Sequence, residues 1–306
     1  MLIVRVMRKA EISKRALVVL VVMSTAGLIA NRSAASQSSS GQVCKAESKL
    51  MDVTGLAEAS GLAVSRVTPG RLWSHADSGA PEIVAVDTKG KVTGRVSVPD
   101  ATLVDWEAIA AAPCGSGSCL FIADIGDNAA ERKEVTIYRV PEPAMPSGSV
   151  KVDGILRASY PDGEHDAEAL LAGPDGRLFI VTKGETDDIG LYRFPSDLRT
   201  DAPMKLERVG KALSKGQPNP GERITDGAIS PDGQRVVLRT KSALIFYRAT
   251  EFLNGDFKET GRMDLRSLKE PQGEAVAFGS ADTVYLAGEG GSKEQPGTLA
   301  VLSCSR

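Results

Sequence analysis

Five stretches of the sequence repeat one pattern, and this repeat constrains the fold more than any other feature. Each stretch begins with a polar or acidic residue, continues with a small residue and an apolar pair, passes through a turn, and ends in a β-branched run. The small residues stand 47, 61, 59 and 47 positions apart, at Gly61, Ala108, Ala169, Ala228 and Ala275. Self-similarity at this period is typical of propellers and solenoids.

Each unit continues with a third predicted strand, and four of the five units also contain a fourth. Four short strands joined by turns make one propeller blade. The fifth unit ends after its third strand, and residues 47–56 can supply the missing one, which would leave no strand edge open. We therefore predict an all-β protein, a five-bladed β-propeller over residues 47–306, with an N-terminal strand closing the last blade. A sixth blade would need another unit within 141–165 or 195–222.

The N-terminal region has the pattern of a targeting segment. Basic residues precede the apolar run from Ala16 to Ala30, and small residues follow at 33–36. The run is shorter than the roughly 20 residues that a spanning helix needs. We predict a signal peptide over 1–35 and a flexible linker over 36–46, with an uncleaved anchor as the alternative. A cleaved peptide implies a secreted or periplasmic (cell-envelope) protein that does not insert into a membrane.

The four cysteines fit an oxidising compartment. Cys114 and Cys119 bracket a short turn, and Cys44 and Cys304 lie near the two ends of the predicted propeller. We expect one disulfide within each pair. Zinc is the competing interpretation, but the chain has no CxxC pair and only two histidines.

Charge and motifs exclude several function classes. The formal net charge is −2 and no basic block occurs, so nucleic acid is not an expected partner. The sequence contains no GxSxG elbow, no Walker loop and no HExxH.

The predicted chemistry lies on one face of the propeller. Acidic residues stand where the first strands begin and in the loops between second and third strands, and both places meet at the same end of the channel. Crowded carboxylates need a counter-charge, and calcium accepts six to eight oxygen ligands in flexible geometry. We predict one calcium ion bound by Ser60, Glu107, Glu168, Asp226 and Glu274. The alternative is that these acids pair with arginine and lysine.

Other polar residues at this face are candidates for catalysis or binding. The catalytic candidates, which could activate water, are His75, Asp77 and Asp105. The segment DIGDN offers Asp124, Asp127 and Asn128 as an oxygen-rich binding site, with an Asx-type turn as the alternative. Three cationic residues either pair with the acids or hold a small anionic ligand such as phosphate: Lys183, Arg239 and Lys241.

The strand starts SGLA, EAIA, EALL and GEAVA resemble those of the SdiA-regulated family of exported five-bladed propellers and of the calcium-activated nucleotidase (apyrase) family. The second family places Ser, Glu, Glu, Ser and Glu on successive inner strands around one calcium. The matching positions here are Ser60, Glu107, Glu168, Gly227 and Glu274. Gly227 departs from the pattern, and Thr225, Asp226, a carbonyl or water would have to substitute. The nucleotidase family's catalytic residues find no match, so nucleotide hydrolysis is not implied.

Two functions follow as expectations. The first is a calcium-dependent hydrolase acting on a phosphorylated or other anionic substrate. The second is a non-catalytic, calcium-stabilised monomer that binds a glycan, a peptide or a cell-envelope partner. Five-bladed propellers also include glycosidases, but aromatic residues, which form sugar platforms, are only 5% of this chain.

Overall fold

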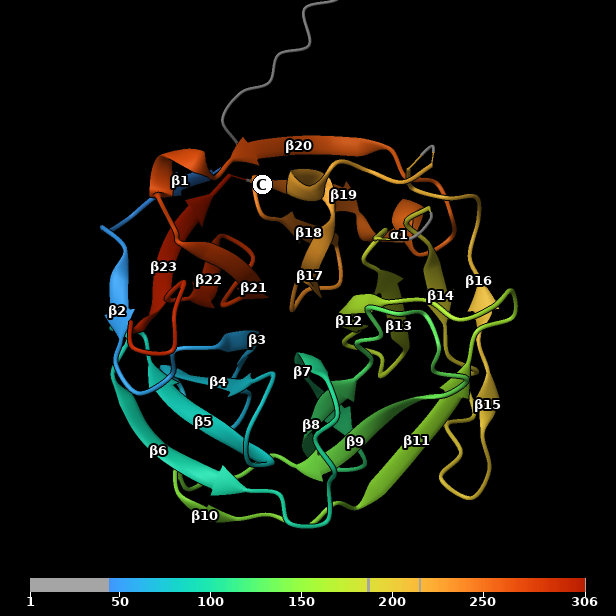
Figure 1. Cartoon of the computed structure of the whole chain (residues 1–306), viewed down its shortest axis with the longest axis horizontal. Coiled ribbons are helices and arrows are strands. Elements are labelled where there is room, and N and C mark those ends of the chain that lie inside the picture. Colours follow the sequence, from blue (N-terminus) through green and yellow to red (C-terminus); the bar gives the residue numbers. More distant parts are fainter. Residues whose placement is uncertain (1–43, 186–187, 215, 306) are drawn as a thin grey trace, which may run out of the picture. The chain divides into compact units, whose positions relative to one another are not determined.

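A computed structural model describes residues 44–185, 188–214 and 216–305. The predicted signal peptide and most of the predicted linker lie outside these residues. Five sheets follow one another along the chain and surround a central channel, and each begins with its innermost strand (Figure 1). The structure therefore confirms the five-bladed β-propeller.

Blades one to four are each built from strands that are consecutive or nearly consecutive in sequence. Blade one contains β3 (Ala59–Val64), β4 (Arg71–Ala76), β5 (Glu82–Asp87) and β6 (Val92–Ser97). Blade two contains β7 (Trp106–Cys114), β8 (Gly117–Asp124), β9 (Val135–Pro141) and β11 (Gly154–Ser159). Blade three contains β12 (Ala167–Ala172), β13 (Leu178–Thr182), β14 (Leu191–Arg193) and β16 (Glu207–Arg208). Blade four contains β17 (Ile224–Ile229), β18 (Arg235–Thr240), β19 (Ala243–Arg248) and β20 (Glu259–Asp264).

Blade five joins the two ends of the propeller. It contains β21 (Gln272–Phe278), β22 (Thr283–Glu289) and β23 (Gly297–Cys304). Two N-terminal strands, β1 (Cys44–Ala46) and β2 (Met51–Val53), both pair antiparallel with β23. The predicted closure is confirmed, but the linker boundary was wrong: residues 44–46 are a strand, because their backbone groups bond along β23.

Both predicted disulfides are confirmed. Cys44 lies directly opposite Cys304 in the β1–β23 ladder, and the two are bonded across 260 residues of sequence. The second bridge, Cys114–Cys119, spans the turn between β7 and β8. Within the residues described, every cysteine is paired.

The connections between blades also protect sheet edges. Strand β10 (Gly148–Ser149) runs parallel to β6 at the outer edge of blade one, and β15 (Met204–Lys205) runs parallel to β11 in blade two. The connection from β14 to blade four is divided between two sheets, since β15 pairs with blade two and β16 pairs with blade three. Both strands cover sheet edges whose backbone groups need partners. The short helices are α1 (Ala249–Phe252), η1 (Pro220–Glu222) and η2 (Arg266–Leu268).

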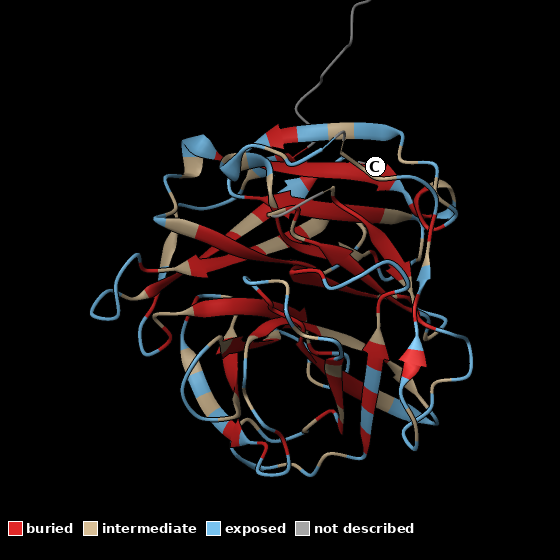
Figure 2. Cartoon of the chain, turned by 45° about the vertical axis from the view of Figure 1, so that its right-hand side comes forward, coloured by how far each residue is buried: buried red, intermediate tan, exposed pale blue. Residues whose placement is uncertain are grey.

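The core lies between adjacent blades. Trp73 and Trp106 are both 0% exposed and belong to one cluster between blades one and two. Buried residues dominate the inner strands, while the outermost strands alternate between buried and exposed positions (Figure 2). This alternation is expected of strands with one face on the core. Across the described residues, no helix is long and apolar enough to cross a membrane.

Candidate functional site

Every innermost strand contains one β-bulge at the same place, just inside the end of the channel where the strand begins. The strand register shifts around one residue in each blade. A bulge leaves one residue without a cross-strand partner and changes where its side chain is directed. The five bulged residues are Ser60, Glu107, Glu168, Thr225 and Glu274. We call this set the oxygen ring, because each member offers a hydroxyl or carboxyl group.

The ring corrects the sequence alignment in blade four. The small-residue repeat matched Gly227 to Ser60 and the glutamates, but the bulge in β17 lies between Ile224 and Asp226 and so falls on Thr225. The sequence of side chains around the channel is therefore Ser, Glu, Glu, Thr, Glu. The aspartate predicted as a ligand, Asp226, lies one residue further along.

Asp226 links two blades. Its carboxyl group accepts the backbone N–H of Gly227 at 2.7 Å and that of Val276, in blade five, at 2.8 Å. The side chain is buried, and burial raises its pKa well above the usual range despite both hydrogen bonds. The structure places Asp226 beside the ring rather than in it.

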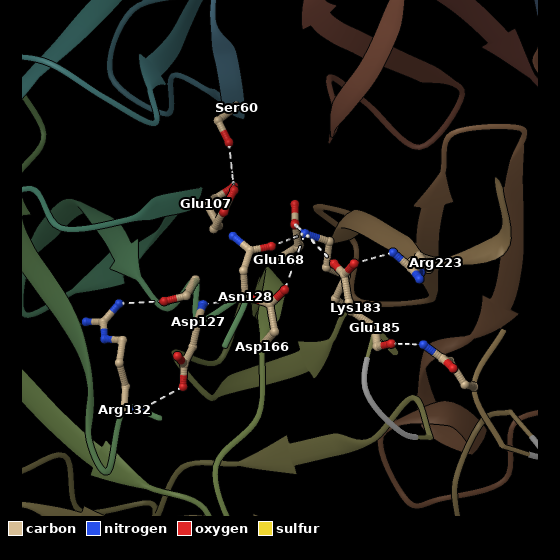
Figure 3. A network of polar contacts seen from close by, with 12 residues as sticks. Ser60, Glu107, Asp127, Asn128, Arg132, Asp166, Glu168, Lys183, Glu185 and Arg223 are labelled. Atoms are coloured by element: carbon tan, nitrogen blue, oxygen red, sulfur yellow. Dashed lines mark hydrogen bonds and ion pairs between the residues drawn. The ribbon is translucent and has the colours of Figure 1, made fainter. Parts of the chain in front are cut away.

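Two contacts organise the carboxyl groups of the ring (Figure 3). Ser60 donates from Oγ to Oε2 of Glu107 at 3.0 Å. Nζ of Lys183 lies 2.5 Å from Oε1 of Glu168. Lys183 directly follows β13, so it approaches the oxygen ring from the loop between β13 and β14.

The ring carboxyl groups have raised pKa values. Burial raises the pKa of Glu107 well above its usual range, and the charges of Glu168 and Asp105 add to the effect. Burial raises the pKa of Glu168 to about 8, with Lys183 opposing the shift. Burial also raises the pKa of Glu274, opposed by Lys241. Burial is the largest cause of all three shifts, and repulsion by neighbouring carboxylates adds to it at Glu107 and Glu168.

More carboxyl groups surround the channel entrance on this side, which we call the acidic mouth. The pKa of Asp77 is raised by burial and by Glu58, and that of Asp105 by burial and by Asp166. Burial, together with Glu274 and Asp77, raises the pKa of Glu289 to about 7. The sequence prediction did not select Glu289, although its place at the end of the second strand of its unit, β22, gave the signal.

The opposite end of the channel has different chemistry. A cavity of about 360 Å³ is lined there by the second halves of the innermost strands, including Leu62, Ile109, Leu170 and Val276. Among the described residues that line it, none is a carboxylate. Acidic groups are thus concentrated at one end of the channel.

The donor set of the ring fits a hard cation. All five side chains offer oxygen, the ligand atom that calcium prefers, and each is at most 7% exposed. Within the described part of the chain, Oγ1 of Thr225 is buried without a hydrogen-bond partner. A buried hydroxyl without a partner is unfavourable unless something else binds it.

The side chains of the oxygen ring are not arranged to coordinate a metal ion in this structure. In the ranges that the structure describes, no three His, Cys, Asp or Glu side chains converge as a metal ion would need. Glu168 is engaged by Lys183, and Glu107 by Ser60. The residues that would hold calcium are those of the oxygen ring.

The catalytic candidates occupy different environments. His75 is 0% exposed, its ring lies edge-on to Trp106 at 5.7 Å between centroids, and burial lowers its pKa to about 4. Asp77 and Asp105 are half-buried at the acidic mouth. The structure brings the two aspartates to the site, whereas His75 lies in the packed interior.

The segment DIGDN forms a structured loop over the acidic mouth. The carboxylate of Asp127 accepts the backbone N–H groups of Glu131 at 3.0 Å and Arg132 at 2.7 Å. These bonds reach four and five residues along the chain, beyond the two residues of the predicted Asx-type turn. Asp124 pairs with Arg132 at 2.7 Å. Only Asn128 of the three predicted binding residues is exposed.

Gly126 lets this loop lie against the site. A β-carbon at position 126 would collide with the carboxyl groups of both Asp105 and Glu107. Glycine therefore permits close approach of the loop backbone to the acids. The loop also contacts blade three, since the N–H of Asp127 donates to Oδ1 of Asp166 at 2.7 Å.

The three cationic residues predicted to bind an anion lie in three different environments. Lys183 is part of the carboxylate cluster, and Lys241 is exposed in the turn after β18. Arg239 is 0% exposed and donates to the carbonyls of Ala275 and Ala287 and to Glu270. The structure thus places Arg239 in the interface between blades four and five, where all its contacts are internal.

Comparisons with known proteins show the fold. No known family model matches the chain, and no curated protein matches it. Among solved structures it is similar to the PQQ-bound aldose sugar dehydrogenase of Streptomyces coelicolor, with 14% identity, a TM-score of 0.54, and coverage of 87% of this chain and 99% of that one. It also matches a calcium-binding protein, regucalcin, of Agrobacterium tumefaciens, with 15% identity, a TM-score of 0.45, and coverage of 87% and 97%. The chain is a β-propeller with five blades.

Proposed function

We propose that this protein is an exported calcium-binding propeller that hydrolyses a phosphorylated or other anionic substrate at its acidic mouth. One observation carries the proposal: the five equivalent bulges direct a hydroxyl or carboxyl group from every blade to one level of the channel. Burial raises the pKa of all three glutamates, and a divalent cation bound among them would stabilise their ionised forms. The two disulfides are compatible with a secreted or periplasmic protein.

Residues at the mouth supply the rest of the proposed chemistry. Calcium bound in the ring would polarise a phosphoryl or similar oxygen. Asp105 is half-buried beside Glu107, and its raised pKa suits it to take a proton from water. Lys183 and the exposed Lys241 place positive charge at the same end of the channel, where they favour an anion.

Calcium binding is tested on dialysed protein by following the melting temperature. A ligand that binds only the folded state stabilises it by about 2.7 kcal/mol at a hundredfold excess over its dissociation constant. Chelator should lower the melting temperature, and calcium should restore it. Glu168→Gln should weaken the response, while Glu47→Gln, an exposed residue outside the ring, should leave it intact. A melting temperature that neither chelator nor calcium moves, in protein without bound calcium, would contradict calcium binding.

Hydrolysis is tested by a screen of phosphoesters and glycosides with calcium or with chelator. We expect turnover of an anionic substrate only with calcium. Asp105→Asn should reduce kcat by about a hundredfold or more, the typical contribution of a general base. Activity that persists in chelator, or is unchanged in Asp105→Asn, would overturn this mechanism.

A second candidate is a non-catalytic calcium-stabilised monomer that binds a glycan, a peptide or a cell-envelope partner. The observation in its favour is the burial of His75, which removes one of the three candidate bases from the mouth. This candidate predicts the same response of the melting temperature to calcium, but no turnover of any substrate in the screen.

A further inference from the structure

The ammonium group of Lys183 sits in a shell of oxygen atoms. Its Nζ lies 2.5 Å from Glu168, 3.3 Å from Asp166, 3.3 Å from Glu185 and 3.2 Å from Asn128. An ammonium has three N–H donors, so four acceptors exceed what it can satisfy with directed hydrogen bonds. The arrangement resembles the oxygen shell of a bound cation (Figure 3).

The surroundings keep this group positively charged. A lysine ammonium is protonated at neutral pH, and three carboxylates, those of Glu168, Asp166 and Glu185, contact this one. The side chain is 17% exposed, so solvent screens these contacts only in part.

Lys183 neutralises only part of the cluster. None of the ion pairs formed among the described residues reaches Glu107 or Glu274. Both glutamates belong to the same ring as Glu168. A cation that binds all three would therefore contact Glu168 beside the ammonium of Lys183, where the two positive charges repel each other.

We propose that Lys183 is a built-in counter-ion that competes with calcium for Glu168 and so sets the calcium affinity of the channel. This inference rests on the proposed calcium site. When calcium enters the ring, its two charges repel the ammonium, which keeps Asp166, Glu185 and Asn128 as partners nearer the loops of the acidic mouth. The channel with Lys183 paired to Glu168 and the channel with a bound cation are thus two states of one carboxylate cluster.

Replacing the lysine by a neutral side chain should tighten calcium binding. Removing one positive charge from beside a divalent ion is worth about tenfold in affinity even with water-like screening. We therefore expect Lys183→Met to bind calcium at least about tenfold more tightly than the wild type by titration calorimetry. Lys183→Gln removes the same charge, and it replaces the methionine variant in the experiment if that variant does not fold. Lys183→Arg keeps the charge and should bind as the wild type does.

A matched control distinguishes competition by Lys183 at Glu168 from a general change in the electrostatic potential of the protein. Lys293 pairs with Glu58 at 3.2 Å, and its side chain is 74% exposed. Lys293→Met makes the same change in net charge outside the shell around Glu168, and we expect less than a twofold change in affinity.

A second readout is the melting temperature without calcium. Lys183→Met should melt lower than the wild type in chelator, because Glu168 loses its partner, and should gain more on adding calcium. Equal tightening in Lys183→Met and Lys293→Met, or no tightening in either neutral Lys183 variant, would overturn the inference while leaving calcium binding intact. Absence of calcium binding in the wild type and in all variants would instead overturn the proposed calcium site, and this inference with it.

Discussion

Ser60 donates a 3.0 Å hydrogen bond to Oε2 of Glu107, although the two residues are 47 positions apart and belong to different blades. Both are bulged residues at the start of an innermost strand. The bond joins neighbouring members of the oxygen ring. It shows that residues related by the repeat are also in contact.

Ser60→Ala should destabilise the protein by about 1–2 kcal/mol, because a buried carboxyl group loses its hydrogen-bond donor. Urea unfolding at neutral pH measures this change. The control is Ser78→Ala, which removes an equivalent hydrogen bond of 2.8 Å to Glu58 at an exposed position. We expect less than about 0.5 kcal/mol there. Equal effects in the two variants would show that burial of the ring adds nothing to the bond.

Arg239→Met should cost about 3–5 kcal/mol. The change leaves Glu270 buried without its ion partner and two carbonyl groups without their donor. Removing both charges, in Arg239→Met with Glu270→Gln, should recover part of the loss. Arg262→Met, which breaks an exposed pair with Glu259, should change stability by less than about 1 kcal/mol. Wild-type stability in Arg239→Met would contradict the structural role.

His75 should make the protein less stable in mild acid. Burial lowers its folded-state pKa to about 4, against 6.5 for the exposed residue. Between these values the unfolded chain binds a proton that the folded chain excludes, so the His75 contribution is complete above pH 6.5 and is lost as the pH falls toward 4. The full loss is about 3 kcal/mol.

The measurement is the free energy of unfolding at several pH values for the wild type and for His75→Gln, which takes up no proton. The difference between the two should change across pH 4–6.5 and stay constant above it. A difference that is constant over the whole range would mean that His75 is protonated equally in both states.

The two disulfides should differ in their contribution to stability. In the chain-entropy model the bridge between Cys44 and Cys304 contributes about 5.5 kcal/mol, because it closes a loop of 260 residues, and the bridge between Cys114 and Cys119 about 2 kcal/mol. Double serine variants of each pair, compared by denaturant unfolding, test this order. A larger loss from the Cys114–Cys119 pair would contradict it.

The sequence by itself determined the number of blades, the order of their strands and the cysteine pairs. Strand and turn signals are local, since alternating apolar residues and turn residues act within a few positions of each other. The number of times these signals repeat gives the number of blades. Closure of the propeller places Cys44 near Cys304, and a short turn places Cys114 near Cys119, which is why both bridges were predictable.

Only the tertiary structure decided which residues line the channel and which charges meet. Thr225 replaced Gly227 in the ring because a bulge depends on the pairing between two strands, and the spacing along one strand does not reveal it. Lys183 meets Asn128 across 55 residues, and Arg239 turns into the next blade. Such contacts are set by distances through space and by burial. A repeat in the sequence places the blades, but their packing decides which polar groups remain available to bind a ligand.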